Sequence, residues 1–161
     1  MQIAVCSDIH DNIWALERAL AQMQDAEALL FCGDLCAPFT LAQLAAGLTA
    51  PIHVVWGSND GDKLLLSRQA GRSAHVQLHG ELAQVELDGV RIGVNHYPEI
   101  ARRLVTSGAY DLVCYGHDHT PLIEPVGAAM LLNPGEVMGR FGEAGWVLYD
   151  AETGSFQRYL I

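Results

Sequence analysis

The stretch QIAVCSDIHDNIWALERALAQM, residues 2–23, decides the fold class of this chain. Its first part, Gln2–Ser7, is apolar and predicts a buried strand that ends in polar side chains. Asp11 or Asn12 can then cap a helix, because these residue types accept a hydrogen bond from a free backbone N–H. Apolar residues recur at helical spacing in the rest of the stretch, at Leu16, Ala19, Leu20 and Met23. The stretch therefore predicts a strand, a loop and a helix, in that order.

The same unit recurs along the first half of the chain. The apolar run Ala28–Cys32 ends at Gly33-Asp34, and a helix is predicted over Leu41–Leu48. A third run, Ile52–Trp56, ends at Gly57-Ser58-Asn59-Asp60. Strands that alternate with helices favour a parallel sheet, and ligands of such sheets collect beyond the carboxyl ends of the strands. We therefore expect these polar segments to lie at one edge of a sheet.

The second half has a different pattern. Leu82–Leu87 and Val90–Asn95 flank Asp88-Gly89, which is the strongest short signal for an antiparallel hairpin. Pro98–Ser107 can form a helix, and Asp111–Tyr115 is an apolar strand that leads into Gly116-His117-Asp118-His119. Short antiparallel strands are predicted in the remainder, over Pro121–Val126, Ala129–Leu132, Trp146–Tyr149 and Phe156–Leu160. The sheet system is therefore expected to be mixed.

Length and composition limit the classes of protein to which this chain can belong. A chain of 161 residues that is 50% hydrophobic can bury a core without disulfides or a structural metal, so we expect one domain over residues 1–161. Its start carries no basic segment, and no apolar run approaches the roughly 18 residues of a membrane helix. A cytoplasmic protein without membrane contact is expected. The four cysteines lack paired metal-site spacing and are expected to be reduced thiols.

The charge pattern restricts the partners. The net charge is −10, and the nine basic residues are scattered, with only Arg102-Arg103 adjacent. Tight binding of DNA or RNA is therefore not expected, because such binding needs a basic patch along the nucleic-acid backbone. An acidic chain can still hydrolyse a phosphate ester, since two divalent cations reverse the local field around their ligands.

Four short segments carry side chains that can bind metal: Asp8-Ile9-His10, Gly33-Asp34, Asn95-His96 and Gly116-His117-Asp118-His119. Taken singly, each has a simpler explanation as a surface loop, a helix cap or a packed histidine. Together they follow apolar strands and supply the carboxylates and imidazoles that Mn, Fe, Ni, Co and Zn accept. Two ions close together also need a bridging carboxylate. Asp34 is the natural bridge.

The order of these segments resembles the calcineurin-like metallophosphoesterase superfamily, specifically its small single-domain phosphodiesterases. Asn133-Pro134-Gly135 and Arg140 are similar to the end of the pattern in that small family. The resemblance covers nearly the whole chain. It implies a four-layer α/β/β/α sandwich, in which two mixed sheets lie face to face with helices on the outside.

The resemblance also implies a dinuclear site. It assigns one metal to four ligands and a second to Asp34 as the bridge, His96, His117 and the third motif; the first set is Asp8, His10, Asp34 and His119. A hydroxide that bridges the two ions would attack phosphorus in line, with the metals neutralising the phosphate oxygens. The function implied is hydrolysis of phosphate diesters without a protein nucleophile.

The third motif departs from the family pattern. Gly57-Ser58-Asn59-Asp60 places Ser58 where the family has an asparagine ligand, and a hydroxyl is a poorer ligand than an amide oxygen. Either Ser58 or Asn59 then completes the second site. Asn59 also stands where a histidine often protonates the leaving group, so diesters with good leaving groups are favoured over monoesters. Asn59, Asp60 and Arg140, which can pair with a phosphate oxygen, are the predicted catalytic residues.

Two hypotheses of different classes follow. The favoured one is a phosphodiesterase with two divalent ions, provisionally Mn with Ni, Fe, Co and Zn left open, acting on a small-molecule or nucleotide diester. The alternative is a protein-binding scaffold with a weak or inactive site, like the retromer subunit that resembles this fold, and Ser58 is the feature in its favour. A homo-oligomer is left open. Trp14, Phe39 and Trp56 flank the motifs and are expected to pack in the core.

Overall fold

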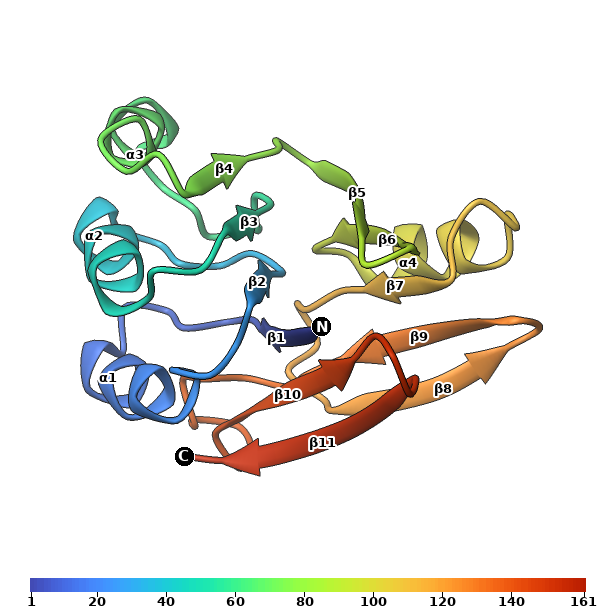
Figure 1. The fold of residues 1–161 in the computed structure, drawn as a ribbon. Helices are drawn as coiled ribbons and strands as arrows, with labels where there is room; N and C mark the ends of the chain where they lie inside the picture. Colours follow the sequence, from blue (N-terminus) through green and yellow to red (C-terminus); the bar gives the residue numbers. More distant parts are fainter.

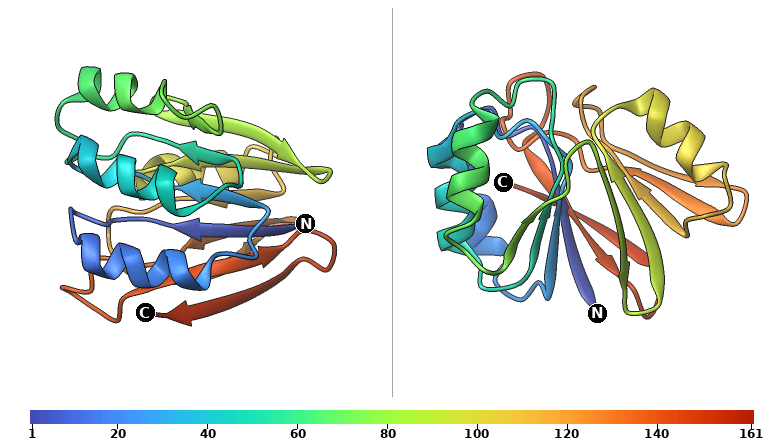
Figure 2. Two further views of the ribbon diagram at one scale, coloured as in Figure 1. Left: turned by 60° about the vertical axis from the view of Figure 1, so that its left-hand side comes forward. Right: turned by 90° about the horizontal axis from the view of Figure 1, so that it is seen from above.

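The computed structural model describes residues 1–161 and contains two β-sheets and four α-helices. Seen from above, the molecule has four layers: three helices, a first sheet, a second sheet and one helix on the far side (Figures 1 and 2). The helices are α1 (Ile13–Gln22), α2 (Pro38–Gly47), α3 (Lys63–Ala70) and α4 (Pro98–Val105). This arrangement confirms the α/β/β/α sandwich that the sequence pattern implied.

The first sheet has six strands in the order β11-β10-β1-β2-β3-β4. Its strands are β1 (Gln2–Cys6), β2 (Ala28–Phe31), β3 (Ile52–Val54), β4 (Val76–Leu78), β10 (Gly145–Asp150) and β11 (Ser155–Leu160). Strands β1 to β4 are parallel, whereas β10 pairs antiparallel with both β1 and β11. The expected parallel sheet of the first half is therefore confirmed, with two antiparallel strands added from the carboxyl end of the chain.

The second sheet has five strands in the order β5-β6-β7-β9-β8. Its strands are β5 (Leu82–Leu87), β6 (Val90–Asn95), β7 (Leu112–Cys114), β8 (Leu122–Val126) and β9 (Ala129–Asn133). The predicted hairpin at Asp88-Gly89 is present, and both residues have positive φ, as a tight two-residue turn requires. Strands β6, β7 and β9 are parallel to one another, so this sheet is also mixed.

Three groups of buried apolar side chains fill the spaces between the four layers. The largest lies under α1, α2 and α3 and includes Leu16, Phe31 and Trp146. A second, with Val5 and Val94, fills the space between the two sheets, and a third packs α4 on the second sheet. The central strand β1 alternates its side chains between two of these groups, with Ala4 and Cys6 in the first and Ile3 and Val5 in the second. The chain is thus packed throughout, and the polar loops at the strand ends rest on a rigid support.

The polar side chains of the loop after β1 fix the first two helices. Asn12 is the N-cap of α1, and its Oδ1 accepts a hydrogen bond from Ala15 N at 3.2 Å. Asp11 instead accepts a hydrogen bond from Ala37 N at 2.9 Å at the start of α2. Of the two cap candidates, Asn12 therefore caps its own helix, while Asp11 joins the first loop to the second.

Several sequence predictions need correction. The expected helix Leu41–Leu48 begins earlier, at Pro38, and ends at Gly47, because proline fits the first turn of a helix. Helix α3 and strand β4 were not predicted, since neither has a clear apolar period. The four cysteines are free, as expected.

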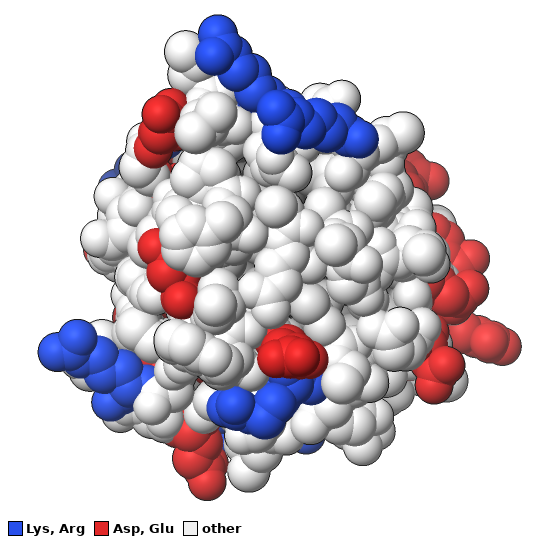
Figure 3. Space-filling view, turned by 90° about the vertical axis from the view of Figure 1, so that its left-hand side faces the viewer, with Lys and Arg blue, Asp and Glu red and all other residues white.

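The prediction that Trp14 and Phe39 pack in the core is wrong, because both side chains are largely exposed. They stand in the first turns of α1 and α2, and Leu64 and Leu65 are exposed in the first turn of α3. Figure 3 shows that the outer face of this helical layer carries few charged side chains over its central part. None of the four helices is long and apolar enough to cross a bilayer.

Candidate metal centre

The predicted motifs meet at one end of the two sheets. The loops after β1, β2 and β3 come from the first sheet, and those after β6 and β7 come from the second. These loops gather at the upper end of the right-hand view in Figure 2, while the N-terminus lies at the lower end. The site thus forms where the carboxyl ends of parallel strands from both sheets face one another.

Asp8, His10 and His119 form the first cluster. The Asp8 Oδ1 atom lies 3.5 Å from His10 Nε2 and 3.4 Å from His119 Nε2. One ligand atom from each of the three residues falls within 4.8 Å of the others. The Asp8 carboxylate is fully buried, whereas the two histidines are partly exposed. Loops from two different sheets therefore contribute to one cluster.

Asp34 joins this cluster to a second one. Its Oδ2 atom lies 3.4 Å from His10 Nε2 and 3.4 Å from His96 Nε2. Asp8, Asp34 and His96 form the second set of ligand atoms within 4.8 Å, and all three residues are buried. The same carboxylate oxygen thus faces a histidine of each cluster, which is the geometry expected of a bridging ligand.

The polar atoms of these clusters fit a metal better than they fit one another. Asp8 Oδ1, His10 Nε2 and His96 Nε2 are buried and have no hydrogen-bond partner. Such atoms are rare in folded proteins and call for an explanation. Two ligand atoms about 2.1 Å from a shared ion are separated by roughly 3.0–3.5 Å, and the separations of 3.4–3.5 Å here match that value. A divalent cation would supply the missing partner.

The other nitrogen of each clustered histidine already has a protein partner. His96 Nδ1 donates to the carbonyl of Cys32 at 2.7 Å. His119 Nδ1 donates to Glu136 Oε2 at 2.6 Å, and His10 Nδ1 lies 3.6 Å from the sulfur of Cys36. Groups of this kind fix the orientation and tautomer of metal-binding histidines. The Nε2 atoms of all three are therefore directed into the clusters.

Electrostatics at the site favour a cation. Burial opposes the charged form of Asp34, but the neighbouring His96 imidazole and the hydrogen bonds from Asn59 outweigh it and lower the pKa of Asp34. The Asp8 carboxylate raises the pKa of His10, and Asp34 raises the pKa of His96 against the effect of its burial. The negative charge of Asp8 and Asp34 therefore favours a cation between the histidines. A bound metal ion would displace any protons from the histidine Nε2 atoms.

Glycines allow the loops to come this close together. A Cβ on Gly57 would collide with the backbone and carboxylate of Asp34, and one on Gly116 would collide with Ser7 and Asp8. Close approach of loops at such points requires glycine. Backbone hydrogen bonds fix the two carboxylates: His117 N donates to Asp8 Oδ2 at 3.1 Å, and Asn59 N donates to Asp34 Oδ1 at 2.7 Å.

His117, Ser58 and Asn59 lie around the second cluster. The His117 ring is 5.0 Å from the His96 ring and is exposed, and neither compact set of ligand atoms includes it. Ser58 Oγ lies 3.3 Å from Asp34 Oδ2, and Asn59 Nδ2 donates to the same oxygen at 2.8 Å. Both side chains of the divergent motif therefore lie at the Asp34 carboxylate.

Asp60 belongs to neither cluster and holds the loops in place. Its carboxylate accepts hydrogen bonds from Gly57 N at 2.6 Å, from Cys36 N at 2.9 Å and from Asp34 N at 3.3 Å. These bonds connect the loop after β2 with the loop after β3. Asp60 therefore positions the loop that carries Asp34.

Arg140 lies on the exposed loop after β9, and its guanidinium stands 5.5 Å from the centre of the Phe141 ring. Phe141 in turn packs edge-on against His119, with ring centres 5.1 Å apart. Arg140 forms no ion pair with a carboxylate, so its charge is available to an anion at the edge of the site. Its loop thus borders the first cluster.

Sequence reasoning missed Glu136, which contacts a candidate ligand directly. This residue follows Asn133-Pro134-Gly135 and is 1% exposed. An acidic residue immediately after a turn motif, in an otherwise apolar segment, was the available signal. A buried carboxylate of this kind normally needs a specific partner.

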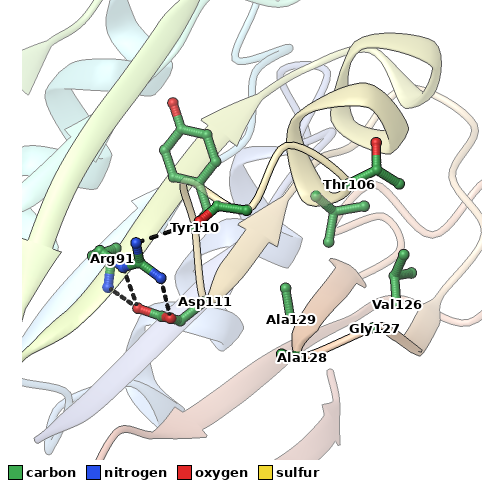
Figure 4. Close-up of a pocket in the computed structure, with 10 residues that line it drawn as sticks. Arg91, Thr106, Tyr110, Asp111, Val126, Gly127, Ala128 and Ala129 are labelled. Atoms are coloured by element: carbon green, nitrogen blue, oxygen red, sulfur yellow. Dashed lines mark hydrogen bonds and ion pairs between the residues drawn. The ribbon is translucent and has the colours of Figure 1, made fainter.

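A hollow of about 320 Å³ lies elsewhere, at the opposite end of the second sheet. Figure 4 shows Arg91 and Asp111 paired there, with Tyr110 beside them. The Arg91 guanidinium is held by two hydrogen bonds to Asp111, of 3.0 and 2.7 Å. Its charge is therefore already matched, and the candidate metal centre does not extend to this hollow.

Known proteins resemble the chain along its whole length. The model of the calcineurin-like phosphoesterase superfamily domain matches residues 1–154. Phosphodiesterase MJ0936 of Methanocaldococcus jannaschii is 29% identical over 143 residues, which cover 86% of each protein. A solved archaeal phosphodiesterase superposes with a TM-score of 0.93 and 26% identity over the whole of both chains. Vps29 of Chaetomium thermophilum shares the fold, with a TM-score of 0.75 and 15% identity over all of this chain and 92% of that one.

Proposed function

Because this chain belongs to the calcineurin-like phosphoesterase superfamily, we propose that it is a phosphodiesterase that uses two divalent metal ions. The observation that carries the proposal is the convergence of unpartnered ligand atoms on two buried carboxylates. Asp8 Oδ1, His10 Nε2 and His96 Nε2 lack hydrogen-bond partners, and Asp34 Oδ2 lies between the two histidines. The relative from Methanocaldococcus jannaschii, itself named a phosphodiesterase, supports the reaction class.

The proposed ligands divide into two sets that share Asp34. The first set is Asp8, His10, Asp34 and His119, whose facing atoms are 3.4–3.5 Å apart. The second set is Asp34, His96 and His117, together with Ser58 or Asn59. Carboxylate and imidazole ligands suit Mn, with Fe, Ni, Co and Zn as alternatives. When bound, two such ions supply Lewis-acid activation of water and neutralise the charge of the phosphate.

The chain itself orients the substrate and excludes competing chemistry. Asp34 is fixed by Asn59, and Asp8 is fixed by the backbone of His117, so the ligand positions are preorganised. In the metal-free chain, burial and the neighbouring carboxylates raise the pKa of the Cys36 thiol to about 12, which keeps it protonated. Arg140 offers a free positive charge to a phosphate oxygen. Asn59 lacks a proton to donate to a poor leaving group, which favours diesters over monoesters.

The test is hydrolysis of bis-p-nitrophenyl phosphate by metal-stripped protein, with and without added Mn²⁺. We expect activity only with metal, and lower kcat/KM for p-nitrophenyl phosphate than for the diester. The metal-stripped protein with Mg²⁺ at the same ionic strength serves as the control for general salt effects. Absence of activity with Mn, Fe, Ni, Co and Zn would contradict the proposal and favour a protein-binding scaffold.

Ser58→Asn is expected to tighten the second metal site by about tenfold, because an amide oxygen is a better ligand than a hydroxyl and because supporting groups change metal affinity by about 10- to 100-fold. Calorimetric titration of metal-stripped protein with Mn²⁺ measures this change. Ser155→Asn, on the exposed start of β11, is the matched control. Identical titrations for the wild type and Ser58→Asn would place the missing ligand at Asn59.

A further inference from the structure

Glu136 uses both oxygens of a buried carboxylate, and the two oxygens face different parts of the molecule. Oε2 accepts the hydrogen bond of His119 Nδ1 at 2.6 Å. Oε1 accepts two backbone hydrogen bonds, from Phe141 N at 2.6 Å and from Gly142 N at 2.7 Å. One side of the carboxylate therefore holds a proposed metal ligand, and the other holds a surface loop.

That loop borders the reaction site. Phe141 is 72% exposed, yet its ring stands edge-on to the ring of His119. The guanidinium of Arg140 lies 5.5 Å from the centre of the Phe141 ring. An exposed aromatic ring and an unpaired cation are both suited to contact an anionic ester with an aromatic group. The loop at Gly139–Gly142 is therefore in position to contact a substrate.

We infer that Glu136 is a positioning residue that couples the first metal site to the loop of Arg140 and Phe141. Occupation of the site by a divalent ion and ordering of the loop then favour each other. The inference rests on the metal sites of the proposed function. It goes beyond them because Glu136 is no metal ligand and because the loop is part of neither cluster.

Geometry explains the coupling. An ion held by His119 would fix the plane of the imidazole and strengthen its Nδ1–H as a donor to Glu136 Oε2, which would hold that oxygen in place. Because the carboxylate is planar, Oε1 is then fixed in the direction of the two loop N–H groups. In reverse, an ordered loop holds Glu136 and presents His119 in the orientation that binds metal. Thermodynamic linkage requires that both effects have the same size.

Glu136→Gln separates the two contacts because an amide cannot accept on both sides. If the amide oxygen faces His119, the NH₂ group meets the two N–H donors of the loop. If the oxygen faces the loop, the NH₂ group meets His119 Nδ1, which must then accept a hydrogen bond. The ring proton would move to Nε2, and His119 could no longer bind a metal. Either arrangement breaks the coupling while the size of the side chain stays the same.

The experiment measures Mn²⁺ affinity by calorimetry and hydrogen exchange of residues 139–144 by mass spectrometry, with and without Mn²⁺. In the wild type, we expect Mn²⁺ to slow exchange of this segment. In Glu136→Gln, we expect no slowing and metal affinity about 10- to 100-fold weaker, the range for residues that support metal ligands. Glu143→Gln is the matched control, since Glu143 is exposed on the same loop and pairs only with Arg158.

Gly142→Pro tests the coupling from the loop side and does not depend on the folding of the Glu136 variant. It removes one N–H donor to Oε1 and places the proline Cδ where that N–H pointed, so the loop must move away from the Glu136 carboxylate, while the new Cβ meets no atom within 4 Å. Reciprocity predicts weaker Mn²⁺ binding, although every proposed ligand is unchanged. A merely structural role for Glu136 would alter the metal-free Tm and leave the Mn²⁺-induced change in exchange intact.

The outcomes are distinct. Equal Mn²⁺ affinity and equal slowing of exchange in the wild type, Glu136→Gln and Gly142→Pro would overturn the coupling and leave the proposed function standing. Absence of Mn²⁺ binding in the wild type would contradict both. Loss of the metal-induced slowing in the two variants, with the Glu143→Gln protein behaving as the wild type, supports the coupling.

Discussion

Asp34→Asn is expected to lower kcat/KM for bis-p-nitrophenyl phosphate by at least about a thousandfold, because a catalytic metal supplies several kcal/mol and each 1.4 kcal/mol is a factor of ten. Asp34 Oδ2 faces His10 and His96 at 3.4 Å each, so it is the group that both proposed sites share. A neutral amide cannot bridge two cations. Its NH₂ group would also oppose the donors of Asn59, which now bond the carboxylate.

The measurement combines steady-state kinetics with the number of metal ions bound at saturation. We expect fewer than two ions per chain in the variant. Asp25→Asn, at an exposed position after α1, is the matched control and should keep wild-type activity and metal content. Normal activity with two bound ions in Asp34→Asn would contradict the ligand assignment.

Asp60→Ala is expected to lower both stability and activity. Three backbone N–H groups would lose their acceptor, at a cost of about 3 kcal/mol if each unsatisfied group contributes at the lower end of its range. That corresponds to a fall in Tm of roughly 6–12 °C for a chain of this size. Since the loop of Asp34 is released, kcat/KM should fall by about a hundredfold, as for a displacement of about 1 Å at a reacting centre.

Thermal unfolding of metal-free protein and the kinetics of refolded, metal-loaded protein measure the two effects. Asp62→Ala is the control, because Asp62 caps α3 through a single hydrogen bond from Leu65 N. The loss of that cap should cost about 1 kcal/mol and leave kcat/KM unchanged. An Asp60→Ala protein with wild-type Tm would show that water replaces the carboxylate at all three N–H groups.

The sequence predicted the loops of the site better than their surroundings. Apolar strands that end in polar ligands are a local pattern, so Asp8, Asp34 and His96 could be found and their proximity inferred. The four-layer fold came only from the resemblance of the motifs to a known family, because no local pattern decides which sheet faces which. Helix α3 was missed for a related reason: its residues show little amphipathic period, and tertiary packing on α2 stabilises it.

Roles that depend on hydrogen-bond partners could not be predicted. Asn12 was a candidate cap of α1, and its Oδ1 has that role, but its Nδ2 also donates to Met138 O at 2.9 Å, which no local pattern indicates. Glu136 had no assigned role, although it contacts His119. The partners of the bonds from Asn12 to Met138 and from His119 to Glu136 lie 126 and 17 residues apart in the sequence, and only the fold brings them together.

The backbone at the candidate ligands has a consequence for how this sequence can change over time. Asp8, His10, Asp34, His117 and His119 all have positive φ, a conformation that non-glycine residues rarely adopt. At His10 and His117, whose side chains hold no backbone group of another loop, glycine would relieve the backbone, so mutations that stabilise the metal-free chain are available there. Drift under selection for stability alone would therefore erode the ligand set. A lineage that keeps all five side chains is one in which their chemistry is still in use.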